Sequence, residues 1–220
     1  MQTLTLAIFD VDHTLIQGDS LLWFGKFLLA RRLPCFSEIP LFVARSLGYV
    51  AHAVDAGQVK ASFLRVFASG LRAVEMSSLV DEFAKNILVP RLCRQAKERI
   101  HWHQTQGHQV VFLSASPASY LEGLARALEV KSVIATQLKW RDGVFCGDLE
   151  GANCKGEEKL ARLLANYQGQ VVDWPSSYYY ADSSSDIPVF EQVGHPVMIN
   201  PKPALAQTGT PRQWPIERWS

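Results

Sequence analysis

An apolar run that stops at two acids places the strongest limit on what this chain can fold into. The run Leu4–Phe9 has the composition of a strand buried on both faces, and Asp10 and Asp12 follow it directly. This pattern predicts the carboxyl edge of a parallel α/β sheet, where such folds bind ligands. Because two carboxylates one residue apart repel each other, we expect the pair to need a bound cation or a shared proton.

A second apolar run, residues 109–113, ends in the hydroxyl group of Ser114. A helix is predicted over Ala118–Leu128, with Ser116 as its N-cap. Ser114 and the backbone N–H of Ala115 would then lie between a strand end and a helix N-terminus, which favours anion binding. The alternative is a capped helix preceded by a serine without a function.

Lys155 stands at the start of a predicted helix that runs through Leu164. The helix dipole disfavours a cation at this end, so Lys155 is expected to have an anionic partner. The alternative is an ordinary surface lysine.

A third apolar run, Tyr178–Ala181, again ends in acid, at Asp182. The position of Asp182 at a strand end suits a metal ligand. Asp186 precedes a predicted helix over residues 187–192 and could serve only as the N-cap of that helix.

These four signals, in this order, resemble the haloacid dehalogenase-like superfamily of Mg²⁺-dependent phosphohydrolases. The chain is most similar to the phosphoserine-phosphatase-like branch, whose helical cap is inserted between the first and second motifs. Phosphoserine phosphatases usually carry G-D-G-x-N-D where this chain has residues 181–186, A-D-S-S-S-D. This departure weakens the case for phosphoserine specificity but leaves the implied chemistry unchanged, so a phosphoserine-like substrate stays among the candidates.

The resemblance implies a role for each acid. Asp10 would attack phosphorus and become an aspartyl-phosphate, and Asp12 would protonate the departing alkoxide and then take a proton from water. Mg²⁺ would be held by the Asp10 carboxylate, the Asp12 main-chain carbonyl and Asp182.

The resemblance also implies a phosphate-binding set. Ser114, the N–H of Ala115 and Lys155 would bind the non-bridging phosphoryl oxygens. Asp186 would orient a water on the metal or hold Lys155. For His13, beside Asp12, a structural hydrogen bond is favoured over proton transfer.

The predicted fold is a Rossmann-like parallel sheet flanked by helices, with a small inserted helical bundle. Residues 1–17 and 88–220 are predicted to form the core, and residues 18–87 the cap. A strand over 130–136 is followed by a predicted hairpin over 137–151 with Asp142-Gly143 at its turn. The tail, which carries Trp214 and Trp219, is expected to pack onto the core.

Substrate specificity is expected in the cap. By the resemblance, Asp19 is a candidate for contact with a substrate amine and Arg65 for contact with a carboxylate. Asp19 could instead simply cap the helix that begins after it.

The leading functional hypothesis is therefore hydrolysis of a small phosphomonoester, such as an amino-acid or amino-alcohol phosphate. A second hypothesis uses the apolar helix over residues 39–54 to admit a lipid-like phosphate. A third passes the phosphoryl group to an alcohol.

Composition excludes several other classes. The net charge of +1 offers no electrostatic case for nucleic acid. The apolar stretches around residues 21–30 and 39–54 are interrupted by charge and fall short of the about 18–20 residues of a membrane span. The scattered cysteines Cys35, Cys93, Cys146 and Cys154, with no visible signal peptide, predict a reduced cytoplasmic protein. His101 and His103 lie two apart on a predicted helix, which argues against a zinc pair.

Overall fold

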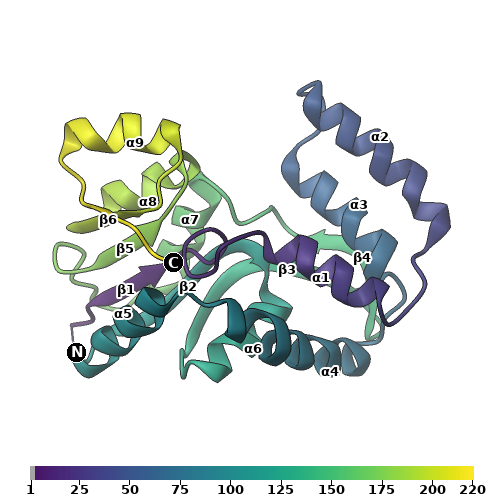
Figure 1. Cartoon of the computed structure of the whole chain (residues 1–220), viewed down its shortest axis with the longest axis horizontal. Helices are drawn as coiled ribbons and strands as arrows, with labels where there is room; N and C mark the ends of the chain where they lie inside the picture. The colour runs from purple at the N-terminus through teal and green to yellow at the C-terminus, as the bar shows by residue number, and fades with distance from the viewer. Residues whose placement is uncertain (1–2) are drawn as a thin grey trace.

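The computed structural model describes residues 3–220, and these hold a seven-stranded sheet in the order β4-β3-β2-β1-β5-β6-β7 (Figure 1). All neighbouring strands run parallel except β3 and β4. The α/β fold predicted from the sequence is confirmed; Met1 and Gln2 of the predicted core lie outside the described residues. The strands are β1 (Leu6–Phe9), β2 (Gln109–Pro117), β3 (Ser132–Arg141), β4 (Val144–Glu150), β5 (Tyr178–Ala181), β6 (His195–Ile199) and β7 (Ile216–Glu217).

The central strand β1 is buried on both faces, which explains its unbroken apolar sequence. Ala7 and Phe9 belong to the hydrophobic cluster on one face, and Leu6 and Ile8 to the cluster on the other. All four are fully removed from solvent. Helices therefore have to cover both faces of the sheet, as in other parallel α/β folds.

The regular elements between β1 and β2 are all helical, as predicted for the segment from about residue 20 onward. They are α1 (Ser20–Leu29), α2 (Ile39–Val50), α3 (Ala56–Ala68), α4 (Ala73–Phe83) and α5 (Arg94–Thr105). The later helices are α6 (Ala118–Ala127), α7 (Glu157–Asn166), α8 (Ile187–Gln192) and α9 (Pro203–Gly209). Short helical turns join several of them.

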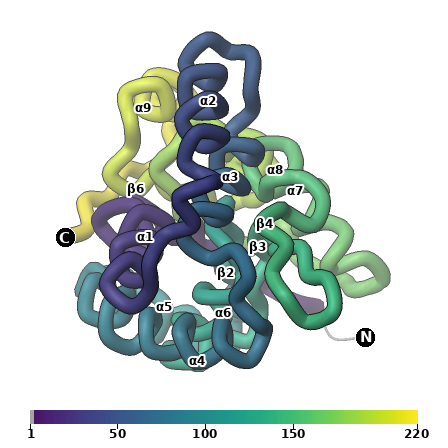
Figure 2. The backbone as a smooth tube through the Cα atoms, turned by 90° about the vertical axis from the view of Figure 1, so that its right-hand side faces the viewer, coloured from purple at the N-terminus to yellow at the C-terminus, as the bar shows by residue number. Residues whose placement is uncertain are grey.

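The helices of residues 18–87 differ in what they pack against. Helices α2 and α3 project from the sheet, whereas α4 lies along α6 (Figures 1 and 2). The rings of Phe24 in α1 and Phe83 in α4 both contact Tyr120 of α6, with centroids 5.1 and 5.3 Å away. Aromatic packing thus joins both ends of the inserted segment to a helix of the core.

The hairpin predicted around Asp142-Gly143 is present, formed by β3 and β4. Both turn residues have positive φ, +50° and +74°, as the preferred two-residue hairpin turn requires. The end of the tail is also packed as predicted: Trp219 is 3% exposed, and its backbone N–H donates to Asn200.

Among residues 3–220, no helix combines the length and the apolar character needed to cross a membrane.

Candidate active site

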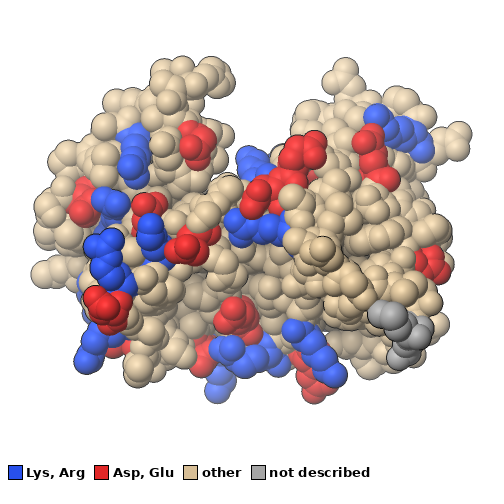
Figure 3. Space-filling view, turned by 180° about the vertical axis from the view of Figure 1, so that it is seen from behind, with Lys and Arg blue, Asp and Glu red and all other residues tan. Residues whose placement is uncertain are grey.

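A cavity of about 280 Å³ opens at the carboxyl edge of β1, β2 and β5. The space-filling view shows the surface hollowed between its two upper lobes, with acidic and basic side chains gathered beside the hollow (Figure 3). All the predicted site residues except Arg65 line the cavity, together with several that the sequence analysis did not single out. The lining includes Asp10, Asp12, His13, Asp19, Lys60, Ser114, Ala115, Asn153, Lys155, Lys159, Asp182, Asp186 and Lys202.

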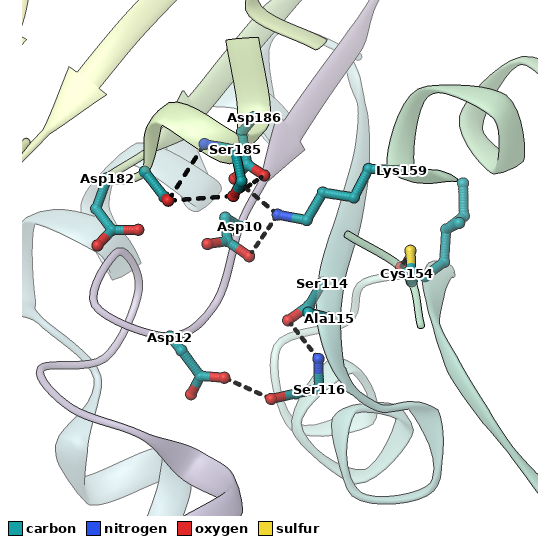
Figure 4. A network of polar contacts seen from close by, with 12 residues as sticks. Asp10, Asp12, Ser114, Ala115, Ser116, Cys154, Lys159, Asp182, Ser185 and Asp186 are labelled. Atoms are coloured by element: carbon teal, nitrogen blue, oxygen red, sulfur yellow. Dashed lines mark hydrogen bonds and ion pairs between the residues drawn. The ribbon is translucent and has the colours of Figure 1, made fainter. Parts of the chain in front are cut away.

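Lys159 links two buried acids at the floor of this cavity (Figure 4). Its Nζ atom donates to Asp10 Oδ1 at 3.0 Å and to Asp186 Oδ2 at 2.8 Å. Tyr179 also donates to Asp186 Oδ2, at 3.0 Å. Burial and the nearby acids Asp186 and Asp182 raise the pKa of Asp10 to about 7, against the opposing pull of Lys159. Burial alone would lower the pKa of Lys159, but Asp10 and Asp186 more than offset this and hold the pKa above its ordinary value.

This lysine is not the one predicted. Lys155 is exposed at the cavity wall, and the ion pairs that Asp10 and Asp186 make within residues 3–220 come from Lys159. The signal that could have found Lys159 is its place on the buried face of α7. It lies four residues before Leu163, which is fully buried, and a lysine on such a face needs a partner.

Asp186 is also more than the cap of α8. It stands at the N-cap position, but its side chain makes no capping hydrogen bond there. Its carboxylate instead accepts from Lys159, Tyr179 and Ser185. The backbone of Asp186 is therefore positioned by the start of α8, while its carboxylate pairs with Lys159.

The turn after β2 differs from the prediction at Ser116. Strand β2 extends to Pro117, and this proline, not Ser116, precedes α6. The Ser116 hydroxyl donates instead to Asp12 Oδ2, and its N–H donates to Ser114 Oγ at 3.1 Å. Ser114 is 1% exposed, yet it lines the cavity together with Ala115.

Asp12 is held by hydrogen bonds to both of its carboxylate oxygens. Oδ1 accepts from the backbone N–H of Ser20 at 2.7 Å, and Oδ2 accepts from Ser116. Burial raises the pKa of Asp12, although these hydrogen bonds oppose the shift. The two acids therefore lie in different environments. Asp10 faces a lysine, whereas Asp12 faces hydroxyl and amide donors.

Asp182 supplies a further carboxylate to the same edge, besides those of Asp10, Asp12 and Asp186. It is 2% exposed, and the ammonium group of Lys202 lies 2.7 Å from its Oδ2 atom. In residues 3–220 no three His, Cys, Asp or Glu side chains are grouped so as to hold a metal ion. A cation here would need a set of two carboxylates, main-chain carbonyl oxygen and water, and all of these are ligands of the kind that Mg²⁺ prefers.

Comparison with known proteins identifies the family. The model of the haloacid dehalogenase-like hydrolases matches residues 7–191, from within β1 to within α8. The chain belongs to this family. The acids at the ends of β1 and β5 and the lysine of α7 all lie within the matched region.

Relatives of this hydrolase carry related descriptions. A probable phosphatase of Mycobacterium tuberculosis is 31% identical over 98% of this chain and 76% of its own. A phosphoserine phosphatase of the same organism is 30% identical over 96% of this chain and 69% of its own. A solved structure, of a protein with unknown function from Bordetella pertussis, is 29% identical with a TM-score of 0.84, covering 98% of both chains.

The two substrate-binding candidates of the hydrolase have different positions. Asp19 caps α1, accepting from the N–H of Leu22 at 3.1 Å, and it also lines the cavity, so the capping role does not remove it from the site. Arg65 is directed elsewhere. Its Nε donates to the carbonyl oxygen of Gly147 at 2.6 Å, and it does not line the cavity.

The cation that α3 directs into the cavity is Lys60. Its Nζ donates to the carbonyl oxygen of Ala115 and, at 2.6 Å, to Asn153 Oδ1. Both acceptors are uncharged, and burial lowers the pKa of Lys60 to about 8. Sequence reasoning missed it because Lys60 and Arg65 lie in the same helix, and only the packing of α3 decides which one faces the site.

Proposed function

We propose that this hydrolase is a Mg²⁺-dependent phosphatase that acts through an aspartyl-phosphate on Asp10. The observation that carries the proposal is the contact of Asp10 with Lys159, at the floor of a cavity that Asp12 also lines. A carboxylate nucleophile beside a fixed cation is suited to attack on a phosphoryl group, whose negative charge would otherwise repel it. The phosphatase names of the relatives from Mycobacterium tuberculosis support the same conclusion.

The remaining residues divide the reaction between them. Ser114 Oγ and the N–H of Ala115 bind phosphoryl oxygens, and Lys159 balances the charge that these oxygens bring. Asp12 protonates the leaving oxygen and later takes a proton from the attacking water. Its raised pKa suits a group that must carry a proton for part of the cycle.

The carboxylates of Asp10 and Asp182 and the main-chain carbonyl of Asp12 would hold Mg²⁺. When bound, the ion supplies positive charge that offsets the repulsion between the carboxylates and the phosphoryl group. The acids at this edge support the assignment, since Asp182 and Asp186 both raise the pKa of Asp10 and so favour a cation beside it.

The substrate class we propose is a small polar phosphomonoester, an amino-acid or amino-alcohol phosphate. The cavity is small, about 280 Å³, and its lining includes charges of both signs, Asp19 and Lys60. An ammonium and an anionic group on the leaving alcohol would match these two side chains. We also propose that residues 18–87 act as the cap that closes over this substrate, with α2 and α3 as its projecting part.

A second candidate is an amphiphilic, lipid-like phosphate. No residue of α2 is buried, and Val43, Leu47 and Val50 are 48, 66 and 77% exposed. The lobe of α2 and α3 also carries few charged side chains in the view of Figure 3. Helix α2 packs against α3, whose Ala56 and Lys60 line the cavity. An exposed apolar surface on this lobe favours a substrate with an apolar chain over one that is polar throughout.

The deciding experiment measures phosphate release from a panel that pairs amino-alcohol phosphates with long-chain alkyl phosphates. The proposal requires release that is lost with EDTA, restored by Mg²⁺ and absent in Asp10→Asn. Preference for the alkyl phosphates would support the second candidate. Addition of alcohols with product analysis tests the third hypothesis, because transfer would yield a new phosphate ester in place of free phosphate.

A further inference from the structure

A chain of buried hydroxyl groups leads away from Asp12. Beyond Ser116, which donates to Asp12 Oδ2 (Figure 4), the Oγ atoms of Ser116 and Ser20 lie 3.0 Å apart. The Tyr120 hydroxyl lies 2.9 Å from Ser20 Oγ. Ser20 and Tyr120 are fully buried and Ser116 is 4% exposed. The chain joins three elements, since Ser116 belongs to β2, Ser20 begins α1 and Tyr120 lies in α6.

The direction of these hydrogen bonds follows from the number of protons. An ionised carboxylate can only accept, so Ser116 must donate its single hydroxyl proton to Asp12. Ser20 must then donate to Ser116, and Tyr120 must donate to Ser20. Tyr120 is suited to be the first donor, because burial raises its pKa well above the ordinary value and keeps the phenol protonated.

The other oxygen of Asp12 is fixed by the same segment. Ser20 donates its backbone N–H to Oδ1, and its hydroxyl supports the serine that binds Oδ2. Ser20 therefore acts on both oxygens, one directly and one through Ser116. The Asp12 carboxyl group can keep this rotation only while α1, β2 and α6 keep their positions relative to one another.

We propose that Ser116, backed by Ser20 and Tyr120, is a positioning residue that sets the direction of the Asp12 carboxyl group for proton transfer to the leaving oxygen. The inference rests on the proposed function, in which Asp12 is the acid. It goes beyond it by assigning a task to three hydroxyl groups that contact neither the phosphoryl group nor the metal. The alternative is a purely structural role, in which the three hydroxyl groups only satisfy one another's hydrogen bonds inside the core and do not affect proton transfer by Asp12.

A positioning role and a packing role for Ser116 predict different results when its hydroxyl is removed. They differ in how the loss of kcat/KM depends on the leaving group of the substrate. p-Nitrophenyl phosphate and phenyl phosphate have nearly the same shape, but nitrophenolate leaves readily without a proton, whereas phenolate needs more help from an acid. The ratio kcat/KM reports the steps up to departure of the leaving group, so later hydrolysis of the intermediate does not affect it. A misdirected Asp12 should therefore reduce kcat/KM far more for phenyl phosphate.

The test compares Ser116→Ala with Ser116→Thr, which keeps the hydroxyl, and with Ser119→Ala as a matched control. The buried hydroxyl of Ser119 has no hydrogen-bond partner within residues 3–220. For Ser116→Ala we expect kcat/KM on phenyl phosphate to fall by about tenfold or more, and on p-nitrophenyl phosphate by about threefold or less. Ser119→Ala should match the parent on both, and Ser116→Thr should recover most of the loss. Equal losses on both substrates, or no loss, would overturn the inference.

A second readout separates this inference from the proposed function. If the parent releases phosphate neither from these two substrates nor from the panel above, the proposed function fails, and crystal structures of parent and Ser116→Ala then decide the positioning role. We expect the Asp12 carboxyl group to rotate away from the N–H of Ser20 in Ser116→Ala. An unchanged Asp12 side chain would overturn the inference whatever the activity.

Discussion

The ammonium group of Lys159 lies 3.0 Å from the carboxylate of Asp10, although the two residues are 149 positions apart in the chain. Their side chains are only 2 and 11% exposed, so water screens the pair poorly. Burial raises the pKa of Asp10, and the positive charge of Lys159 offsets part of this rise. Lys159 therefore favours the ionised, nucleophilic form of Asp10. The same contact links the stability of this region to its proposed chemistry.

Replacing Lys159 with Met should damage both stability and activity. It would leave Asp10 and Asp186 buried without their cation, which costs on the order of 3–5 kcal/mol when one partner of a buried pair is removed. Phosphatase activity should fall at least about 100-fold, as for the loss of one preorganised charge at a reacting group. Urea denaturation and steady-state kinetics measure the two effects.

Lys155→Met is the matched control, because Lys155 lies four residues earlier and is exposed. Its free energy of unfolding should stay within about 0.5 kcal/mol of the parent, and its kcat should remain near the parent value. An inactive Lys155→Met beside an active Lys159→Met would contradict the assignment of Lys159.

Lys60, and not Arg65, should be the cap cation that affects substrate binding. Lys60 lines the cavity, whereas Arg65 donates to the Gly147 carbonyl. Lys60→Met is expected to raise KM for the preferred substrate about tenfold, the equivalent of one charged hydrogen bond of about 1.4 kcal/mol. Arg65→Met should change KM by less than about threefold. Similar KM changes in both variants would argue against this assignment.

Mg²⁺ should stabilise the protein, and Asp182→Asn should remove most of this effect. A cation that binds only the folded state at 100 times its Kd adds about 2.7 kcal/mol. Thermal denaturation with EDTA and with increasing Mg²⁺ measures the gain without any turnover. Asp148→Asn, which alters an exposed acid on β4, is the control and should respond to Mg²⁺ as the parent does. A full Mg²⁺ response in Asp182→Asn would exclude Asp182 as a ligand.

The buried His103 should make the fold sensitive to acid. Its Nδ1 lies 2.8 Å from Nδ1 of His108 and its Nε2 2.9 Å from the Tyr180 hydroxyl. Burial, with help from His108 and Arg99, lowers the pKa of His103 to about 3 from an ordinary 6.5. The unfolded chain therefore binds a proton at His103 more tightly than the folded chain does. The stability that comes from keeping His103 neutral is fully present above pH 6.5, and it is lost as the pH falls toward 3.

The loss should approach about 1.4 kcal/mol for each pH unit in that range. His103→Gln keeps a hydrogen-bonding side chain but cannot titrate, so its free energy of unfolding should fall less steeply between pH 6.5 and 5. The free energy of unfolding at several pH values gives the slope for each protein. Parallel curves for parent and variant would contradict a neutral buried His103.

Much of the fold was predictable because its signals are local. The apolar run before Asp10 had to be a strand buried on both faces, and Asp142-Gly143 favoured a two-residue turn by its backbone preference alone. The order of strands and acids along the chain also predicted which acids would share one edge of the sheet. No comparable local signal distinguished Ser116 as a helix cap from Ser116 as a donor to Asp12, because serine suits both positions equally well.

The sequence by itself determined the α/β sheet, its helical insertion and the acids at its carboxyl edge, since periodicity and strand ends follow from neighbouring residues. Only the tertiary structure decided which lysine pairs with those acids and which cation of α3 lines the cavity. Lys159 in place of Lys155, and Lys60 in place of Arg65, depend on how α7 and α3 are rotated against the rest of the molecule. That rotation is determined by the packing of distant side chains, and a charge becomes a buried partner only after the packing has excluded water around it.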